Sequence, residues 1–207
     1  MWLNIVACIL CGYLLGNLNG SVCISALMHD DVRSHGSGNA GLTNFIRNYG
    51  AGRALLVILI DAGKAVVACL TGGLLLAPFG LWTEGVMLAG SAVLLGHDFP
   101  ALLGFRGGKG ILSGLFVAFM ADWRIGLILL AVFAIIYFAT RYVSLGSVLA
   151  AAAFGLCFAI FHWDSPFVVA AAVFMGALTI FMHRSNILRL IQGNERKTDL
   201  FKKGSNT

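Results

Sequence analysis

Long apolar segments separated by short polar ones run through the whole chain. A helix needs about 20 apolar residues to cross a bilayer, and seven segments approach that length: 2–28, 53–78, 83–97, 108–121, 124–140, 144–161 and 166–183. The third and fourth are short and glycine-rich, so half-spans shielded by neighbouring protein are the alternative for them. The pattern predicts an all-α fold, a polytopic membrane bundle of seven transmembrane helices.

The composition agrees with a membrane protein. Of 207 residues, 59% are hydrophobic and 11% charged, whereas about a quarter of a soluble domain is charged. We expect one membrane domain, 1–193, with a polar tail, 194–207. The N-terminus lacks a basic leader region and a small-residue cleavage site, which favours a first spanning helix over a removed signal peptide.

The basic residues fall mainly on one side of these spans. An external N-terminus and seven alternating helices place twelve of the fourteen Lys and Arg residues inside: Arg33, Arg47, Arg53, Arg106, Lys109, Arg141, Arg184, Arg189, Arg196, Lys197, Lys202 and Lys203. Positively charged segments stay in the cytoplasm, and an even number of helices would break the asymmetry. We therefore expect the N-terminus outside and the C-terminus in the cytoplasm.

The net charge of +5 does not indicate a nucleic-acid partner, because the basic residues form no run or patch among aromatics. Attraction to anionic membrane lipids or anionic substrates is the interpretation that fits a membrane protein.

The five cysteines all lie in apolar stretches, and none has a histidine at metal-ligand spacing. We therefore predict no metal site and no cofactor.

The first inner segment suits a phosphate group. In His-Gly-Ser-Gly-Asn-Ala-Gly-Leu-Thr-Asn, 35–44, glycines at alternate positions allow backbone N–H groups to converge on an anion. Polar side chains and Arg47 add further donors. An ordinary polar loop has the same composition, so this segment alone leaves both interpretations open.

The second inner segment runs from Gly96-His97 to Gly107-Gly108-Lys109-Gly110. Gly-Gly-Lys-Gly at the start of a helix combines backbone donors, the positive helix end and an ammonium group around one anion. It is not a nucleotide-binding Walker A loop, because that loop needs Gly at 103 and Ser or Thr at 110. A helix stop at the membrane surface is the structural alternative for His97.

The third inner segment begins at His183, and Asn186 shares its face if the last helix continues through both. A basic interfacial helix end is the alternative. The remaining inner turn adds Ser144.

Within the second span, Asp61 and Lys64 are three residues apart, and intramembrane charges of this kind are functional unless they form a structural pair.

Together, these segments resemble the acyl-phosphate-dependent glycerol-3-phosphate acyltransferases of bacterial membranes (the PlsY type). The resemblance covers nearly the whole chain and rests on five ordered motifs: His-Gly-Ser-Gly-Asn-x-Gly-x-Thr-Asn-x-x-Arg at 35–47, Asp-x-x-Lys at 61–64, Gly-His-x-Phe-Pro…Phe-x-Gly-Gly-Lys-Gly at 96–110, Thr-Arg-Tyr-Val-Ser-Leu at 140–145 and His-Arg-x-Asn-Ile-x-Arg-Leu-x-x-Gly-x-Glu-x-Lys at 183–197. It implies seven helices with an external N-terminus in the bacterial inner membrane.

The resemblance also implies transfer of an acyl group from acyl phosphate to glycerol 3-phosphate. By motif, Ser37, Asn39 and Thr43 would hold the acyl-phosphate group, and these residues would bind glycerol 3-phosphate: Arg47, Lys109, Ser144, His183 and Asn186. The chain departs from the family at Asn17-Leu18-Asn19, where Ser-Ile-Pro is usual, and at Ile-Leu-Ser after Gly110. Neither departure removes a phosphate-binding group.

No protein base is evident from the sequence, since none of the five histidines belongs to a His-x4-Asp motif. We therefore expect a substrate phosphate to take the proton, with His183 or His97 as competing bases. The candidate catalytic residues are Ser37, His97, Lys109 and His183. The candidate substrate-binding residues are Gly36, Gly38, Asn39, Gly41, Thr43, Asn44, Arg47, Lys64, Gly107, Gly108, Ser144 and Asn186.

A transporter or flippase for a phosphorylated metabolite or lipid is the alternative function. Transporters place their sites near the bilayer midplane between repeats, whereas this chain has no visible repeat and few polar groups outside. The sequence leaves acyl-chain length and oligomeric state open, and it is compatible with a monomer.

Overall fold

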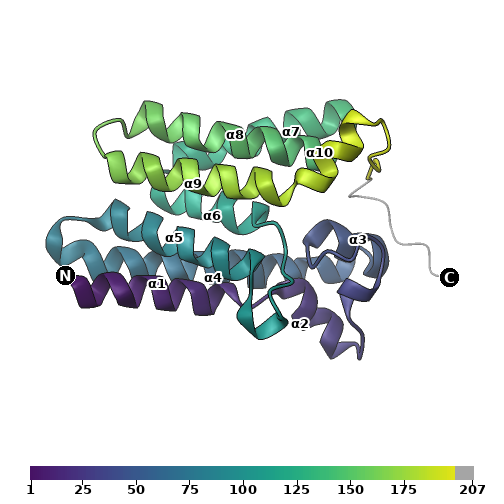
Figure 1. Ribbon diagram of the computed structural model, residues 1–207, viewed down its shortest axis with the longest axis horizontal. Helices are drawn as coiled ribbons and strands as arrows, with labels where there is room; N and C mark the ends of the chain where they lie inside the picture. The colour runs from purple at the N-terminus through teal and green to yellow at the C-terminus, as the bar shows by residue number, and fades with distance from the viewer. Residues whose placement is uncertain (199–207) are drawn as a thin grey trace.

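The computed structural model describes residues 1–198, and over this range the regular secondary structure is entirely helical. The elements are α1 (Trp2–Gly16), α2 (Gly20–Leu27), η1 (Val32–Ser34), α3 (Leu42–Tyr49), α4 (Ala51–Leu76), η2 (Ala77–Phe79), α5 (Trp82–Asp98), η3 (Ala101–Leu103), α6 (Ile111–Ala121), α7 (Trp123–Thr140), α8 (Val143–Phe161), α9 (Pro166–Met182) and α10 (Arg184–Ile191). The short helices α2, α3 and α10 lie toward one end of the bundle, and the N-terminus lies at the other (Figure 1).

The long helices form two groups, which are joined by α6 and by direct packing of α5 on α9. Helices α1, α4 and α5 pack on one another, α8 packs on α7 and α9, and α6 contacts α4, α5 and α7 (Figure 1). The core between them is built largely from small and medium apolar side chains such as Ala65, Ala68, Val86 and Val117. Close backbone approach in membranes depends on small residues. At the α4–α5 contact, a Cβ on Gly72 would overlap the Gly85 carbonyl.

The predicted spans correspond closely to the helices. Four segments are long and apolar enough to cross a membrane: Ala51–Phe79, Trp82–Leu103, Trp123–Thr140 and Val143–Phe161. Two bent pairs, α1 with α2 (40°) and α9 with α10 (58°), raise the number within the described residues to as many as six. The predicted fourth span is α6, which has only 11 residues.

The break between α1 and α2 falls at the unusual Asn17-Leu18-Asn19 sequence. The side chain of Asn19 accepts a hydrogen bond from Val22 N–H (3.1 Å) and caps the start of α2. The Asn17 amide donates to the Tyr13 carbonyl (2.7 Å) and accepts from Leu102 N–H (3.0 Å). Asparagine side chains therefore stabilise the bend between α1 and α2.

A buried ion pair holds this break against α4. Lys64 lies 2.8 Å from the Asp61 carboxylate, and both side chains are nearly inaccessible. Its ammonium donates to the carbonyls of Gly16 (3.3 Å) and Leu18, which the helix break leaves without partners in their own helix. Asp61 in turn accepts from Gly20 N–H (3.1 Å).

We predict that Lys64→Met will destabilise the fold more than the double variant Asp61→Asn/Lys64→Met. The single change leaves a buried carboxylate without its counter-charge, which costs about 3–5 kcal/mol, whereas the double change removes both charges. Thermal unfolding in detergent micelles measures the difference, and Arg53→Met, an exposed change on the same helix, serves as the control. Equal melting temperatures for the single and double variants would contradict the prediction.

Candidate active site

One cavity of about 650 Å³ reaches from the end of the bundle that carries α3 and α10 into its interior. Its size is typical of a small-molecule site. Its inner wall is apolar and comes from several helices, with Leu94, Leu129, Phe133, Phe154 and Met175 among the lining residues. Its mouth carries the polar residues of all three sequence motifs. The cavity therefore joins a charged mouth to an apolar interior.

Most of the predicted site residues line this cavity. They are Ser37, Gly38, Asn39, Gly41, Thr43, Asn44, Arg47, His97, Lys109, Ser144, His183 and Asn186. Four predicted residues do not line it: Gly36, Lys64, Gly107 and Gly108. Three motifs far apart in the sequence thus converge on one cavity. The remaining four residues lie outside its lining.

Asn44 organises the glycine loop from within. Its amide donates to the carbonyls of Val32 (3.1 Å), His35 (3.0 Å) and Asn39 (3.0 Å), and its oxygen accepts from Ser37 N–H (3.0 Å). The side chain is therefore committed to the loop, although the sequence predicts it as a substrate ligand. We assign Asn44 to loop geometry.

Part of the nest that the sequence predicts is occupied by hydrogen bonds within the loop. The N–H groups of Ser37 and Gly38 bond within the loop, to Asn44 and to the His35 carbonyl (3.0 Å). In the described chain, the first-turn N–H groups of Leu42 and Thr43 have no hydrogen-bond partner. The positive end of α3 therefore supplies free backbone donors at the mouth.

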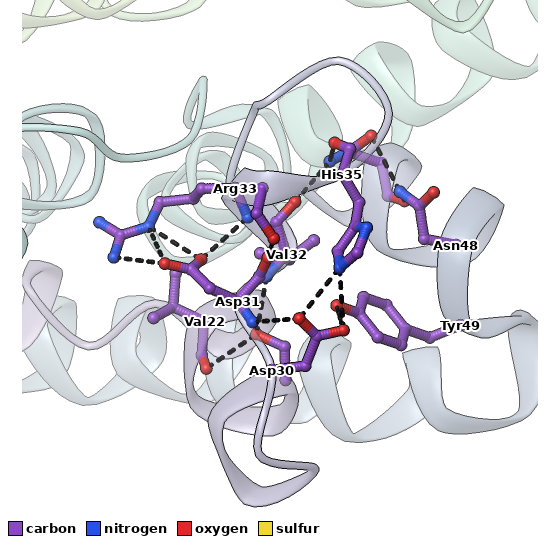
Figure 2. Close-up of polar contacts among 11 residues, drawn as sticks. Val22, Asp30, Asp31, Val32, Arg33, His35, Asn48 and Tyr49 are labelled. Atoms are coloured by element: carbon purple, nitrogen blue, oxygen red, sulfur yellow. Dashed lines mark hydrogen bonds and ion pairs between the residues drawn. The ribbon is translucent and has the colours of Figure 1, made fainter.

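The outer side of the loop is fixed by a group of polar side chains (Figure 2). His35 Nε2 lies 2.9 Å from both oxygens of Asp30, and the Tyr49 hydroxyl donates to the same carboxylate (2.9 Å). Arg33 pairs with Asp31 (2.8 Å) and also donates to the Leu103 carbonyl (3.1 Å). The loop is thus tied to α3 on one side and to the η3 turn on the other.

The Gly-Gly-Lys-Gly loop rests on His97. Gly108 N–H donates to the His97 carbonyl (3.1 Å), and a Cβ on Gly108 would overlap the His97 ring. Gly110, with φ +69°, starts α6 in the left-handed region that glycine favours. Gly107 and Gly108 therefore allow the close packing that directs Lys109 into the cavity, where its ammonium donates to Asn186 Oδ1.

The two candidate bases present different ring atoms. Lys64 Nζ lies 2.7 Å from His97 Nδ1, so the ammonium donates there and occupies the His97 lone pair. His183 Nδ1 lies 2.8 Å from the Thr179 carbonyl, which only accepts, so the His183 proton is on Nδ1. The Nε2 of His183 then carries a lone pair. His183 suits a proton acceptor, whereas His97 suits a supporting role.

Glu195 is a site residue that the sequence predictions omit. Its carboxylate accepts from Asn186 (2.7 Å), Ser144 (2.9 Å) and Arg189 (2.7 Å), and its side chain is 5% exposed. Burial alone raises the pKa of Glu195, but these three hydrogen bonds outweigh it and lower the pKa. Its place in the last motif, 183–197, was the sequence signal that could have identified it. It was omitted because a negative charge is not expected in a site that binds phosphate.

Positive charge nevertheless predominates at the mouth. Burial and the neighbouring Arg189 lower the pKa of Lys109 to about 8, and Arg184 and Arg47 act in the same direction. Within residues 1–198, Glu195 is the carboxylate that opposes these cations in the immediate surroundings of Lys109. An added anion would relieve their mutual repulsion, so the mouth is suited to a phosphate-bearing ligand.

Comparison with known proteins identifies a family that matches this architecture. The family model described as glycerol-3-phosphate acyltransferase matches residues 6–193. The glycerol-3-phosphate acyltransferase of Thermoanaerobacter sp. (strain X514) is 40% identical over 186 residues, covering 89% of this chain and 91% of the relative. That of Shouchella clausii is 37% identical and covers 95% and 97% of the two chains.

Two solved structures of PlsY (YgiH), an integral membrane glycerol 3-phosphate acyltransferase, share the fold at 32% identity. The glycerol 3-phosphate form has a TM-score of 0.85 and covers 96% of this chain and 99% of its own. The lysophosphatidic acid form has a TM-score of 0.82, with coverage of 95% and 96%. The chain therefore belongs to the glycerol-3-phosphate acyltransferase family of integral membrane enzymes.

Proposed function

We propose that this acyltransferase moves a fatty acyl group from acyl phosphate to the 1-hydroxyl of glycerol 3-phosphate, giving lysophosphatidic acid and inorganic phosphate. The observation that carries the proposal is a cavity that combines a cationic mouth with an apolar interior. The interior suits an acyl chain, and the mouth suits the two phosphate groups that must meet there. PlsY, the structural relative, has a glycerol 3-phosphate form and a lysophosphatidic acid form.

The two phosphates have separate sets of groups at the mouth. The first turn of α3, with Ser37, Asn39 and Thr43, would bind the phosphate of the donor beside the acyl carbon. Arg47 and Lys109 would bind the phosphate of glycerol 3-phosphate, because they carry charge and line the same mouth. Asn186 and Ser144 border this acceptor position and are held there by Glu195.

In the proposed reaction, the 1-hydroxyl oxygen attacks the acyl carbon. The bond from that carbon to the phosphate oxygen then breaks, inorganic phosphate leaves, and the hydroxyl proton passes to a phosphate oxygen. Orientation of two bound substrates is worth up to roughly 7–11 kcal/mol, and one donor to the developing oxyanion about 3–4 kcal/mol. His183 Nε2 is the competing proton acceptor.

We also propose seven crossings, with α6 as the short fourth segment enclosed by α4, α5 and α7, and the N-terminus outside. The basic residues of the mouth then face the cytoplasm of a bacterial inner membrane, where soluble glycerol 3-phosphate is available. At the other end, polar groups are paired with one another: Asp122 with Arg124 (2.6 Å) and His162 (3.1 Å), and Ser165 with Glu84 (3.0 Å). This pairing supports an enzyme over the alternative, a transporter of phosphorylated molecules.

Purified protein should convert palmitoyl phosphate and glycerol 3-phosphate into equal amounts of lysophosphatidic acid and inorganic phosphate. Acyl-CoA tested as the donor should give no product, because the mouth groups address a donor phosphate beside the acyl carbon. Product from acyl-CoA alone would contradict the donor assignment, and absence of product from both donors would contradict the function.

In the same assay, complete loss of turnover in His183→Ala with glycerol 3-phosphate binding retained would favour His183 as base over the substrate phosphate.

The pH dependence should report Lys109. Its pKa of about 8 in the free enzyme means that the ammonium loses its proton above that pH, whereas the substrate phosphate, with a second pKa of about 6, stays dianionic. We predict that kcat/KM for glycerol 3-phosphate falls above pH 8, approaching tenfold per pH unit. Lys109→Arg should be less active but should lose this decline, because guanidinium remains charged. An unchanged decline in Lys109→Arg would contradict the assignment.

A further inference from the structure

After α10, the chain turns back across the polar mouth of the cavity. Gly193, with φ +71°, makes the turn, and Asn194 N–H donates to the Arg189 carbonyl (2.8 Å). The following residues, 194–198, are here called the C-terminal strap. Two of them, Glu195 and Arg196, line the cavity. The strap is therefore part of the wall of the mouth.

Thr198 fixes the far end of the strap. Its N–H donates to the Arg141 carbonyl (3.1 Å), and its own carbonyl accepts from the Tyr137 hydroxyl (3.1 Å). Thr198 is 5% exposed and Tyr137 is 2% exposed. Because both backbone groups are bonded to the end of α7, the position of the Thr198 hydroxyl is determined by the bundle and not by the strap alone.

That hydroxyl binds Arg47 from the opposite side of the mouth. Arg47 Nη2 donates to Thr198 Oγ1 and also lies 3.4 Å from the Arg196 carbonyl. The contact joins residues 151 positions apart, from α3 and from the strap. The Nε and Nη1 groups of Arg47 have no hydrogen-bond partner among residues 1–198, and Arg47 lines the cavity. One edge of the guanidinium is thus held while the rest remains available to a ligand.

We propose that Thr198 is a positioning residue for the acceptor substrate, because it holds the Arg47 guanidinium across the mouth. Arg47 is an exposed residue, and an unrestrained arginine side chain loses considerable rotamer freedom on binding an anion. A fixed edge removes part of that entropy cost before the phosphate arrives. The inference rests on the proposed function, since it assigns Arg47 to the phosphate of glycerol 3-phosphate.

A purely structural role for Thr198 makes a different prediction. Its two backbone bonds would anchor the strap whatever the side chain, and Thr198→Val keeps them and nearly the same shape. The hydroxyl is the only polar group that this substitution removes. An effect of Thr198→Val confined to the acceptor substrate would therefore separate positioning of Arg47 from anchoring of the strap.

The experiment is steady-state kinetics of Thr198→Val with glycerol 3-phosphate as the varied substrate. KM for glycerol 3-phosphate should rise about tenfold, the effect of losing one charge-assisted hydrogen bond. The kcat, the KM for acyl phosphate and the melting temperature should change little. Thr198→Ser should restore the wild-type KM. The matched control is Thr71→Val, whose hydroxyl bonds to the Val67 carbonyl in its own helix (2.8 Å).

A double-variant cycle tests whether Thr198 acts through Arg47. Arg47→Lys removes the Nη2 donor, so adding Thr198→Val to it should raise KM no further. A full additional tenfold increase in the double variant would overturn the inference, as would a wild-type KM in Thr198→Val alone. Either result in an enzyme that still forms lysophosphatidic acid leaves the proposed function intact, whereas an inactive wild-type protein would remove the function itself.

Discussion

The arrangement of the site depends on the charge of Lys64 inside the bundle. A buried ammonium is costly unless several groups solvate it, and here its partners come from three elements: the α1–α2 break, Asp61 on α4 and His97 on α5. His97 in turn supports the Gly-Gly-Lys-Gly loop through Gly108. A charge that never reaches the cavity thus links the first helix, the core and the loop that carries Lys109.

The mouth of the cavity combines rigidity with unbalanced charge. Asn44 fixes the glycine loop, Glu195 fixes Asn186 and Ser144, and Thr198 holds Arg47, so the positions of the donors are set by the protein itself. Such preorganisation matters most for a reaction between two anionic substrates, because each must be neutralised before the reacting atoms can approach. In the proposed reaction, the apolar interior would keep the acyl chain out of water.

Hydrophobic patterning did not predict the break of segment 2–28 into α1 and α2 or the short helix α3, but it was enough to predict the extent of most long helices, with 124–140 predicted against Trp123–Thr140 observed. It also predicted which motifs converge. It could not predict which polar side chains face inward, because a donor-rich residue such as Asn44 can serve its own loop as readily as a ligand. Lys64 acts through its buried charge and Gly108 through close packing on His97, and neither lines the cavity. Glu195 was omitted because a negative charge is not expected among groups that bind phosphate.

Direct transfer between two substrates in one cavity is the central claim, and it requires no acyl group on the protein. The most direct measurement incubates the purified protein with acyl phosphate alone and follows its intact mass together with released phosphate. The account predicts an unmodified mass and phosphate release that begins only when glycerol 3-phosphate is added. A stoichiometric burst of phosphate with a matching acyl adduct on the protein would contradict it.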